Sequence, residues 1–98
     1  MWGFQKKMEL GLEEKVIDYY FDRRKAYERN TKNSFKDGLQ IEYSYEGEKR
    51  EKIYNMRVLK VIIEYYPNKL KKSESIYNSD GNVGKRILWK NGKIIRSN

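Results

Sequence analysis

The C-terminal two-thirds of the chain repeats one short pattern, an aromatic residue followed by a turn and then lysine. The pattern begins at Tyr45, Tyr66 and Trp89, so its successive copies are 21 and 23 residues apart. A second landmark, isoleucine followed by tyrosine, begins at Ile53 and recurs 23 residues later. Periods of about 20–50 residues are typical of repeat architectures, in which each unit covers its neighbour's apolar face. We therefore expect residues 39–96 to form successive β-hairpins that stack into one meander.

The hydrophobic pattern inside this region has the period of two that strands require. Residues 39–45 alternate between an apolar set and a polar set that begins with Gln40, which predicts a half-buried strand with the glutamine outside. Asn91-Gly92 suits a two-residue hairpin turn, because both turn positions need positive φ. The sequence predicts five or six short antiparallel strands, within residues 39–45, 50–55, 57–66, 73–78 and 87–96.

Residues 8–29 instead show a helical period. Acidic residues crowd the start of this stretch and basic residues its end, an order that suits the helix dipole. We therefore predict an amphipathic helix over residues 8–29. Its apolar stripe consists of Met8, Leu12, Val16, Tyr20 and Tyr27.

Together these elements predict an α+β fold in one domain, residues 1–98. The helix has to bury its apolar stripe, and the only large apolar surface available is one face of the sheet. The helix would therefore pack on one face of the meander and leave the opposite face free for recognition.

The net charge of +8 comes entirely from the second half of the chain. Residues 1–49 hold ten Lys/Arg and ten Asp/Glu, whereas residues 50–98 hold twelve and four. This asymmetry favours an acidic partner, either nucleic acid or an acidic protein surface. A lysine-rich surface that only maintains solubility is the alternative.

The stretch YYPNKLKKSESIYNSDGNVGKRILWKNGKI resembles the bacterial MORN-variant repeat of the YwqK-like antitoxin family. An aromatic pair, an Asn-Gly-Lys turn and a second tyrosine-containing strand follow one another in the family's order. The resemblance covers residues 39–95. It departs from the family where Asn68 is not followed by glycine and where NMRVL replaces the glycine-rich second turn. The resemblance implies a binding role, as in antitoxin and immunity-like proteins, with no chemistry assigned to the repeat.

The composition argues against an enzyme. The chain has no histidine and no cysteine, so the usual general base, thiolate metal ligands and His-activated nucleophiles are missing. Glu13 and Lys15 have the Glu-x-Lys spacing of metal-dependent nucleases, but that motif belongs on a strand and here falls in the expected helix. We expect no catalytic residue, no metal site and no cofactor. No apolar run approaches the ~20 residues of a membrane span, so we expect a cytoplasmic chain without membrane contact.

A binding surface is the remaining functional candidate. Basic residues interleaved with aromatic ones can bind a protein or single-stranded nucleic acid. We therefore expect an antitoxin- or immunity-like inhibitor, whose partner is an acidic or nucleic-acid-handling protein. The alternative is a nucleic-acid-binding protein, or a phage-type, anti-CRISPR-like inhibitor that occupies the nucleic-acid groove of an enzyme. The protein would be a monomer or a homodimer. The predicted partner-binding residues are Lys69, Lys71, Lys72, Lys85, Arg86, Lys90, Lys93, Tyr66 and Trp89.

Overall fold

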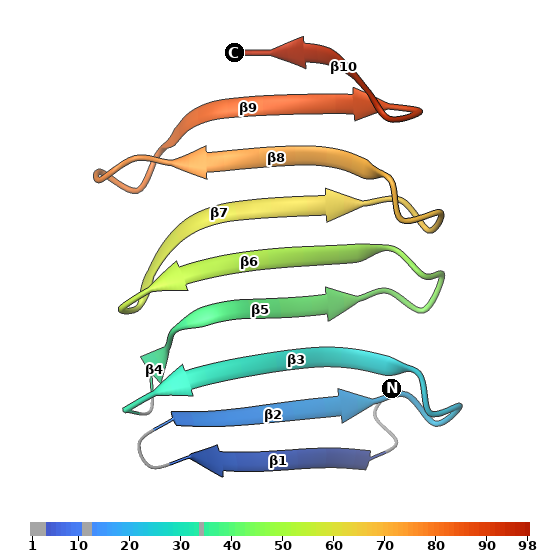
Figure 1. Ribbon diagram of the computed structural model, residues 1–98, viewed down its shortest axis with the longest axis vertical. Coiled ribbons are helices and arrows are strands. Elements are labelled where there is room, and N and C mark those ends of the chain that lie inside the picture. Colours follow the sequence, from blue (N-terminus) through green and yellow to red (C-terminus); the bar gives the residue numbers. More distant parts are fainter. Residues whose placement is uncertain (1–3, 11–12, 34) are drawn as a thin grey trace.

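The computed structural model describes residues 4–10, 13–33 and 35–98, and these residues form one antiparallel β-sheet (Figure 1). Its strands lie side by side in the order β1-β2-β3-β5-β6-β7-β8-β9-β10, and the short β4 pairs only with β3. The strands are β1 (Phe4–Leu10), β2 (Glu13–Tyr19), β3 (Lys25–Lys32), β4 (Phe35–Lys36), β5 (Gly38–Tyr43), β6 (Lys49–Asn55), β7 (Val58–Tyr65), β8 (Lys71–Tyr77), β9 (Val83–Lys90) and β10 (Lys93–Ser97).

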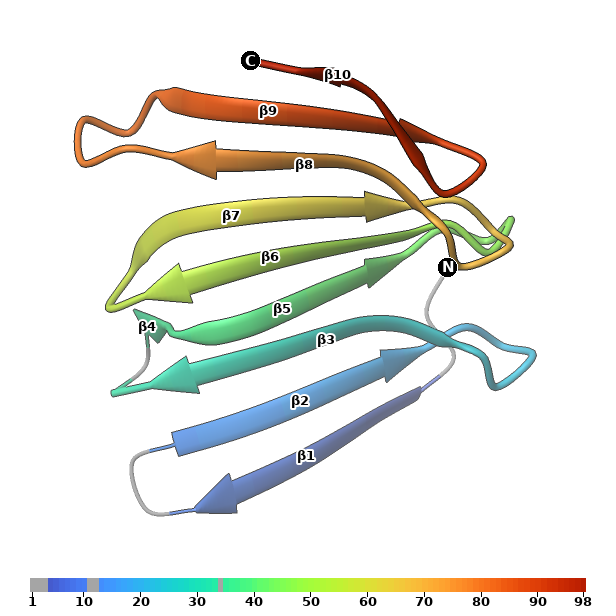
Figure 2. The same ribbon diagram turned by 45° about the horizontal axis from the view of Figure 1, so that its top comes forward.

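The sheet is a single twisted layer. The Cα atoms span 39 × 34 × 18 Å, and strand direction changes steadily from β1 to β10 (Figure 2). Among the described residues no second layer covers either face. The buried apolar residues are few and lie on β2, β3 and β5: Val16, Ile17, Ala26 and Ile41. Most of the burial therefore comes from cross-strand neighbours on the same face.

The predicted α+β fold is wrong, because the region expected to be a helix consists of strands. The described residues contain no helix, and residues 13–29 form β2, a turn and the first part of β3. Residues 11–12 of the predicted helix lie outside the described part. The misleading signal was a turn without glycine: Arg23 adopts φ 72°, in the left-handed region that glycine usually occupies. With no turn residue to mark the boundary, the apolar residues of two short strands fell at helix-like spacing. They therefore resembled one apolar stripe of a helix.

The predicted hairpins of residues 39–96 are confirmed as β5 to β10. The two-residue turn at Asn91-Gly92 also forms, with φ of 53° and 79°. The predicted exposure of Gln40 is wrong, however, because this side chain is fully buried.

Gln40 closes the junction between β3 and β5. The direct ladder between these strands has two residue pairs, whereas β5 and β6 share six. Beyond these two pairs, the side-chain amide of Gln40 forms hydrogen bonds to β3 that a neighbouring strand would otherwise form. Its Oε1 accepts the N–H of Asn30 at 3.0 Å, and its Nε2 donates to the C=O of Asn30 at 2.6 Å. A buried glutamine thus hydrogen-bonds both backbone groups of Asn30, whose C=O also accepts the N–H of Asp37 at 3.1 Å.

Candidate functional site

Three hairpin turns with the same hydrogen bonds lie along one edge of the sheet, on the right in Figure 1, which we call the turn edge. They span residues 20–24, 44–48 and 66–70. In each, the N–H of the first residue donates to the C=O of the fifth, and the N–H of the fourth donates to the C=O of the first, at 2.8–3.0 Å. The fourth residue has positive φ in all three turns, as expected for a type I turn that ends in a left-handed residue.

These turns align an aromatic residue before each turn and a lysine after it in one row. Tyr43 pairs with Lys49, Lys49 with Tyr65, and Tyr65 with Lys71. The Nζ of Lys49 lies 4.5 Å from the ring centroid of Tyr65, and the Nζ of Lys71 lies 5.0 Å from that of Trp89. The row consists of Tyr19, Lys25, Tyr43, Lys49, Tyr65, Lys71 and Trp89. It gives this face a repeated cation–π contact.

A neighbouring row on the same face alternates isoleucine and glutamate. Its members are successive cross-strand partners: Ile17, Glu28, Ile41, Glu51, Ile63, Glu74 and Ile87. Each glutamate pairs with a lysine of the first row, at 2.8 Å for Lys25–Glu28 and 3.3 Å for both Lys49–Glu51 and Lys71–Glu74. These ion pairs neutralise much of the charge that the sequence places on the lysines.

Tyr65 is the most strongly perturbed group of this face. Its O–H donates to Glu51 Oε1 at 2.9 Å. Burial, followed by the hydrogen bond and the negative charge of Glu51, raises the pKa of Tyr65 to about 12. Burial also raises the pKa of Tyr43, with a contribution from Glu28. Both phenols are therefore neutral donors at physiological pH.

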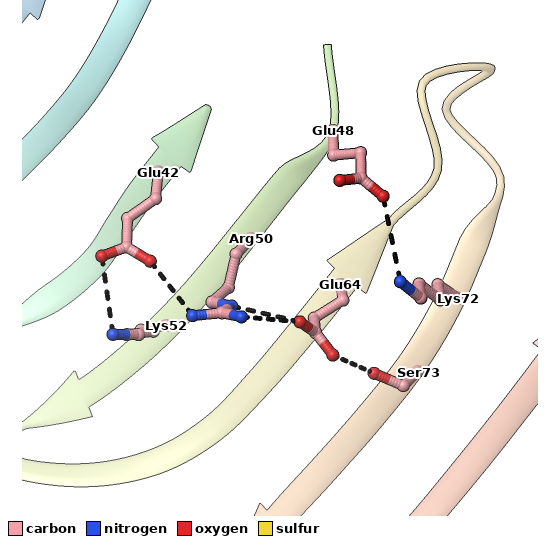
Figure 3. Close-up of polar contacts among 7 residues, drawn as sticks. All are labelled: Glu42, Glu48, Arg50, Lys52, Glu64, Lys72 and Ser73. Atoms are coloured by element: carbon pink, nitrogen blue, oxygen red, sulfur yellow. Dashed lines mark hydrogen bonds and ion pairs between the residues drawn. The ribbon is translucent and has the colours of Figure 1, made fainter. Parts of the chain in front are cut away.

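A polar network crosses four strands on the opposite face (Figure 3). Glu42, Arg50, Glu64 and Ser73 are successive cross-strand partners. Arg50 Nη2 lies 2.9 Å from Glu64 Oε2, and Arg50 Nη1 lies 3.6 Å from Glu42 Oε1. The hydroxyl of Ser73 donates to Glu64 Oε1 at 2.7 Å. This donation and then the guanidinium of Arg50 lower the pKa of Glu64. The network favours one register of β5 to β8.

The structure brings seven of the nine predicted binding residues to one corner of the sheet. They come from two places on the turn edge: the β7–β8 turn with the start of β8, and the end of β9 with the β9–β10 turn (Figure 1). We call this group the basic corner: Tyr66, Lys69, Lys71, Lys72, Trp89, Lys90 and Lys93.

Lys85 and Arg86 do not join the basic corner. They lie in the first half of β9, opposite Ile76 and Ser75 of β8. Five residues of extended chain, about 17 Å, separate Lys85 from Lys90.

The two aromatic rings of the basic corner already carry a cation. Lys71 lies over Trp89, and the Nζ of Lys72 lies 5.7 Å from the ring centroid of Tyr66. Both lysines also have a carboxylate partner, Glu74 for Lys71 and, at 3.8 Å, Glu48 for Lys72. Within the described part of the chain, none of the ion pairs involves the three other lysines of the corner.

Sequence reasoning missed the first unit of the repeat and the glutamates that complete each row. Tyr19 precedes Lys25 by six residues, which is also the spacing of Tyr43 and Lys49. That spacing would have identified the β2–β3 hairpin as a further unit without any glycine. The Ile–Glu alternation is not visible from the sequence, because its members come from different strands.

In the described residues, no group of three or more acidic side chains is arranged to hold a metal ion. Nor does this part of the chain contain a helix with the length and apolarity of a membrane span. Comparison with family models, with curated proteins and with solved structures finds no match to this chain.

Proposed function

We propose that this protein is a non-catalytic inhibitor of the antitoxin or immunity type that binds a target protein through the basic corner. The observation that carries the proposal is that Tyr66, Trp89 and five lysines from two separate hairpins meet at one corner of the sheet, with Trp89 and Lys71 on one face and Lys72 on the other. Aromatic side chains beside cations are typical of protein-binding hot spots. The MORN-variant resemblance, which stays a prediction, implies the same kind of role.

The contacts of the two rings favour a protein partner over nucleic acid. Binding of a single strand depends on bases that stack on open aromatic faces. Lys71 and Lys72 occupy one face of Trp89 and of Tyr66, respectively. A protein surface can contact the edge of such a preassembled cation–ring pair. A base would have to displace the lysine before it could stack on that face of the ring.

Nucleic-acid binding remains the second candidate. One observation favours it: Lys69 lies in a turn of the turn edge, Lys90 and Lys93 flank the next turn, and all three could reach phosphates. We also propose an acidic target and action in the cytoplasm, with which the absence of cysteine is compatible.

The test is a comparison of two double charge reversals that change net charge equally. A tagged chain captures its target from host cells, and the purified target is then titrated with each variant. We expect Lys90→Glu with Lys93→Glu to weaken binding about tenfold or more, about 1.4 kcal/mol or more. Lys85→Glu with Arg86→Glu, on the same strand but outside the corner, should have a much smaller effect.

Equal weakening by both double variants would contradict the proposal, because it would mean that only net charge matters. A labelled single-stranded oligonucleotide decides the alternative. If the wild-type chain binds it with an affinity that falls linearly with salt on logarithmic axes, the protein is a nucleic-acid binder.

A further inference from the structure

A second feature lies at the edge of the sheet opposite to the turn edge, where the β6–β7 turn meets β4 (Figure 1). The side chains there enclose a depression of about 560 Å³. Six of its lining residues carry the argument: Lys32, Phe35, Lys36, Asp37, Met56 and Arg57. We call this depression the Phe35–Met56 pocket.

The β6–β7 turn that forms one wall has an unfavourable backbone for its residues. Met56 and Arg57 both have positive φ, 48° and 73°. The β9–β10 turn has nearly the same geometry, with Asn91 at 53° and Gly92 at 79°. Asparagine and glycine adopt this conformation readily, whereas methionine and arginine adopt it at a cost in free energy. The chain thus builds this turn type twice. One copy uses residues that favour it, Asn91 and Gly92, and the other uses residues that do not, Met56 and Arg57.

The contacts of Met56 and Arg57 within the fold do not account for this choice. The side chain of Met56 is 79% exposed, so it adds little packing. Arg57 lies 4.0 Å from the ring centroid of Phe35, and this ring is itself about half exposed. Backbone strain that the folded state does not recover is a feature of binding sites.

The charges of the pocket indicate what it binds. Lys32, Lys36 and Arg57 supply three cations, and in the described residues none of the ion pairs involves them. Asp37 is the one acidic side chain among the six, and its Oδ1 accepts the N–H of Met56 at 2.9 Å. The pocket therefore combines exposed apolar surface with an excess of positive charge.

We propose that the Phe35–Met56 pocket is a second protein-binding site, which takes an acidic peptide segment anchored by a large apolar side chain. Phe35 and Met56 contact the anchor, and Lys32, Lys36 and Arg57 pair with the flanking carboxylates. Charge complementarity selects this occupant over a second copy of the basic chain. The site does not depend on the basic corner, which lies at the other ends of the strands.

The probe is the synthetic peptide acetyl-Asp-Glu-Phe-Asp-Glu-Leu-amide, added to the full chain while backbone amide resonances are followed by NMR. We expect saturable shifts confined to residues 32–33, 35–37 and 55–58. A peptide with lysine at every acidic position should cause none of these shifts. A peptide with alanine in place of Phe and Leu should bind about tenfold more weakly.

A stabilising variant separates binding from folding. Met56→Asn with Arg57→Gly builds the turn as Asn91-Gly92 is built, so the thermal midpoint should rise while peptide affinity falls about tenfold or more. Arg23→Gly is the matched control, because it relieves a positive φ of 72° at the turn edge, outside the basic corner. It should also raise the midpoint and leave peptide affinity unchanged.

Three results would overturn the proposal: no shift in the wild-type chain, equal peptide affinity in the Met56/Arg57 variant, or shifts that fall on the basic corner. Concentration-dependent shifts of residues 55–58 without peptide would indicate a second copy as occupant and would also overturn it.

Discussion

The β2–β3 hairpin and the β5–β6 hairpin are the same structural unit encoded in two ways. Both have the five-residue turn with identical backbone hydrogen bonds, and both pair an aromatic residue with lysine across it. The β5–β6 turn places Gly47 at the left-handed position, with φ 99°, and the β2–β3 turn places Arg23 there. The unit is therefore defined by the aromatic–lysine pair across its two strands and does not require glycine in the turn. Glycine makes the turn easier to form and easier to recognise.

The two hairpins also differ in how they join the sheet. β6 and β7 share seven residue pairs, whereas the β2–β3 hairpin joins β5 through two pairs and side-chain hydrogen bonds, among them those of the Gln40 amide and that of the Tyr20 O–H to the C=O of Tyr43 at 2.6 Å. This junction is where the N-terminal strands can be separated from the others.

The largest expected effect comes from removing that amide. Gln40→Leu keeps the side-chain size but leaves the N–H of Asn30 without a partner and its C=O with only the N–H of Asp37, at 3.1 Å. We expect a loss of about 1–3 kcal/mol in the free energy of unfolding, the cost of one backbone group left without a hydrogen bond. Urea unfolding measures the loss. Hydrogen exchange of the Asn30 amide should also accelerate more than that of Glu51, and uniform acceleration would argue against a local junction.

A reciprocal exchange tests the two turns. Gly47→Arg should destabilise the fold by about 1–2 kcal/mol, the cost of a left-handed conformation for a residue with a Cβ atom. A Cβ at this position would lie 3.7 Å from Pro67 Cβ, an ordinary contact, so the cost belongs to the backbone. Arg23→Gly should change stability in the opposite direction. Thermal unfolding of both variants gives the comparison, which fails if the two changes have the same sign.

The polar network of β5 to β8 predicts that the stability contributed by Glu64 is lost in acid. Because the pKa of Glu64 is lowered in the fold, its contribution is present above the ordinary value of 4.5 and is lost as pH falls through the folded-state pKa. Glu64→Gln should therefore cost about 1 kcal/mol at neutral pH, in the range of a hydrogen bond to a charged group that is partly exposed. The cost should disappear in strong acid. A pH-independent difference in urea unfolding would rule out the charge as its source.

The aromatic–lysine row predicts a smaller loss of stability at alkaline pH. Tyr65 keeps its proton in the fold up to about 12, whereas the unfolded chain loses it near 10.0, so this group removes stability as pH rises through that window. Tyr65→Phe should cost about 0.5–1.5 kcal/mol at neutral pH, for the lost hydrogen bond to Glu51. The difference from wild type should shrink toward pH 12. Ultraviolet titration of phenolate should show one fewer late-ionising tyrosine.

Sequence reasoning predicted the C-terminal hairpins for identifiable reasons. Gly47, Pro67 and Asn91-Gly92 mark turns locally, so the alternation between them can be read as strands. Arg23 leaves no such mark. The lysines of the basic corner lie near turns, where the structure brings them together, whereas it places Lys85 and Arg86 in the first half of β9. Residues on the two sides of a turn that are close in sequence are also close in space. Residues a few positions apart along one strand are held apart by the extended chain.

The pairing of Gln40 and the Ile–Glu row could not be predicted, because both depend on register between strands. A one-residue shift would move every side chain to the other face. Register in this sheet is set by bulges, such as the one beside Tyr19, and by the network of Glu42, Arg50 and Glu64. These contacts join strands that lie far apart in the chain.

The central claim is that the same hairpin unit recurs in β2–β3, β5–β6 and β7–β8, across the junction at Gln40. Nuclear Overhauser effects between backbone protons of β3 and β5 test it most directly. We predict cross-strand contacts between Tyr27 and Glu42 and between Glu28 and Ile41. Contacts between residues three and four apart throughout residues 13–29, with none from β3 to β5, would contradict the account.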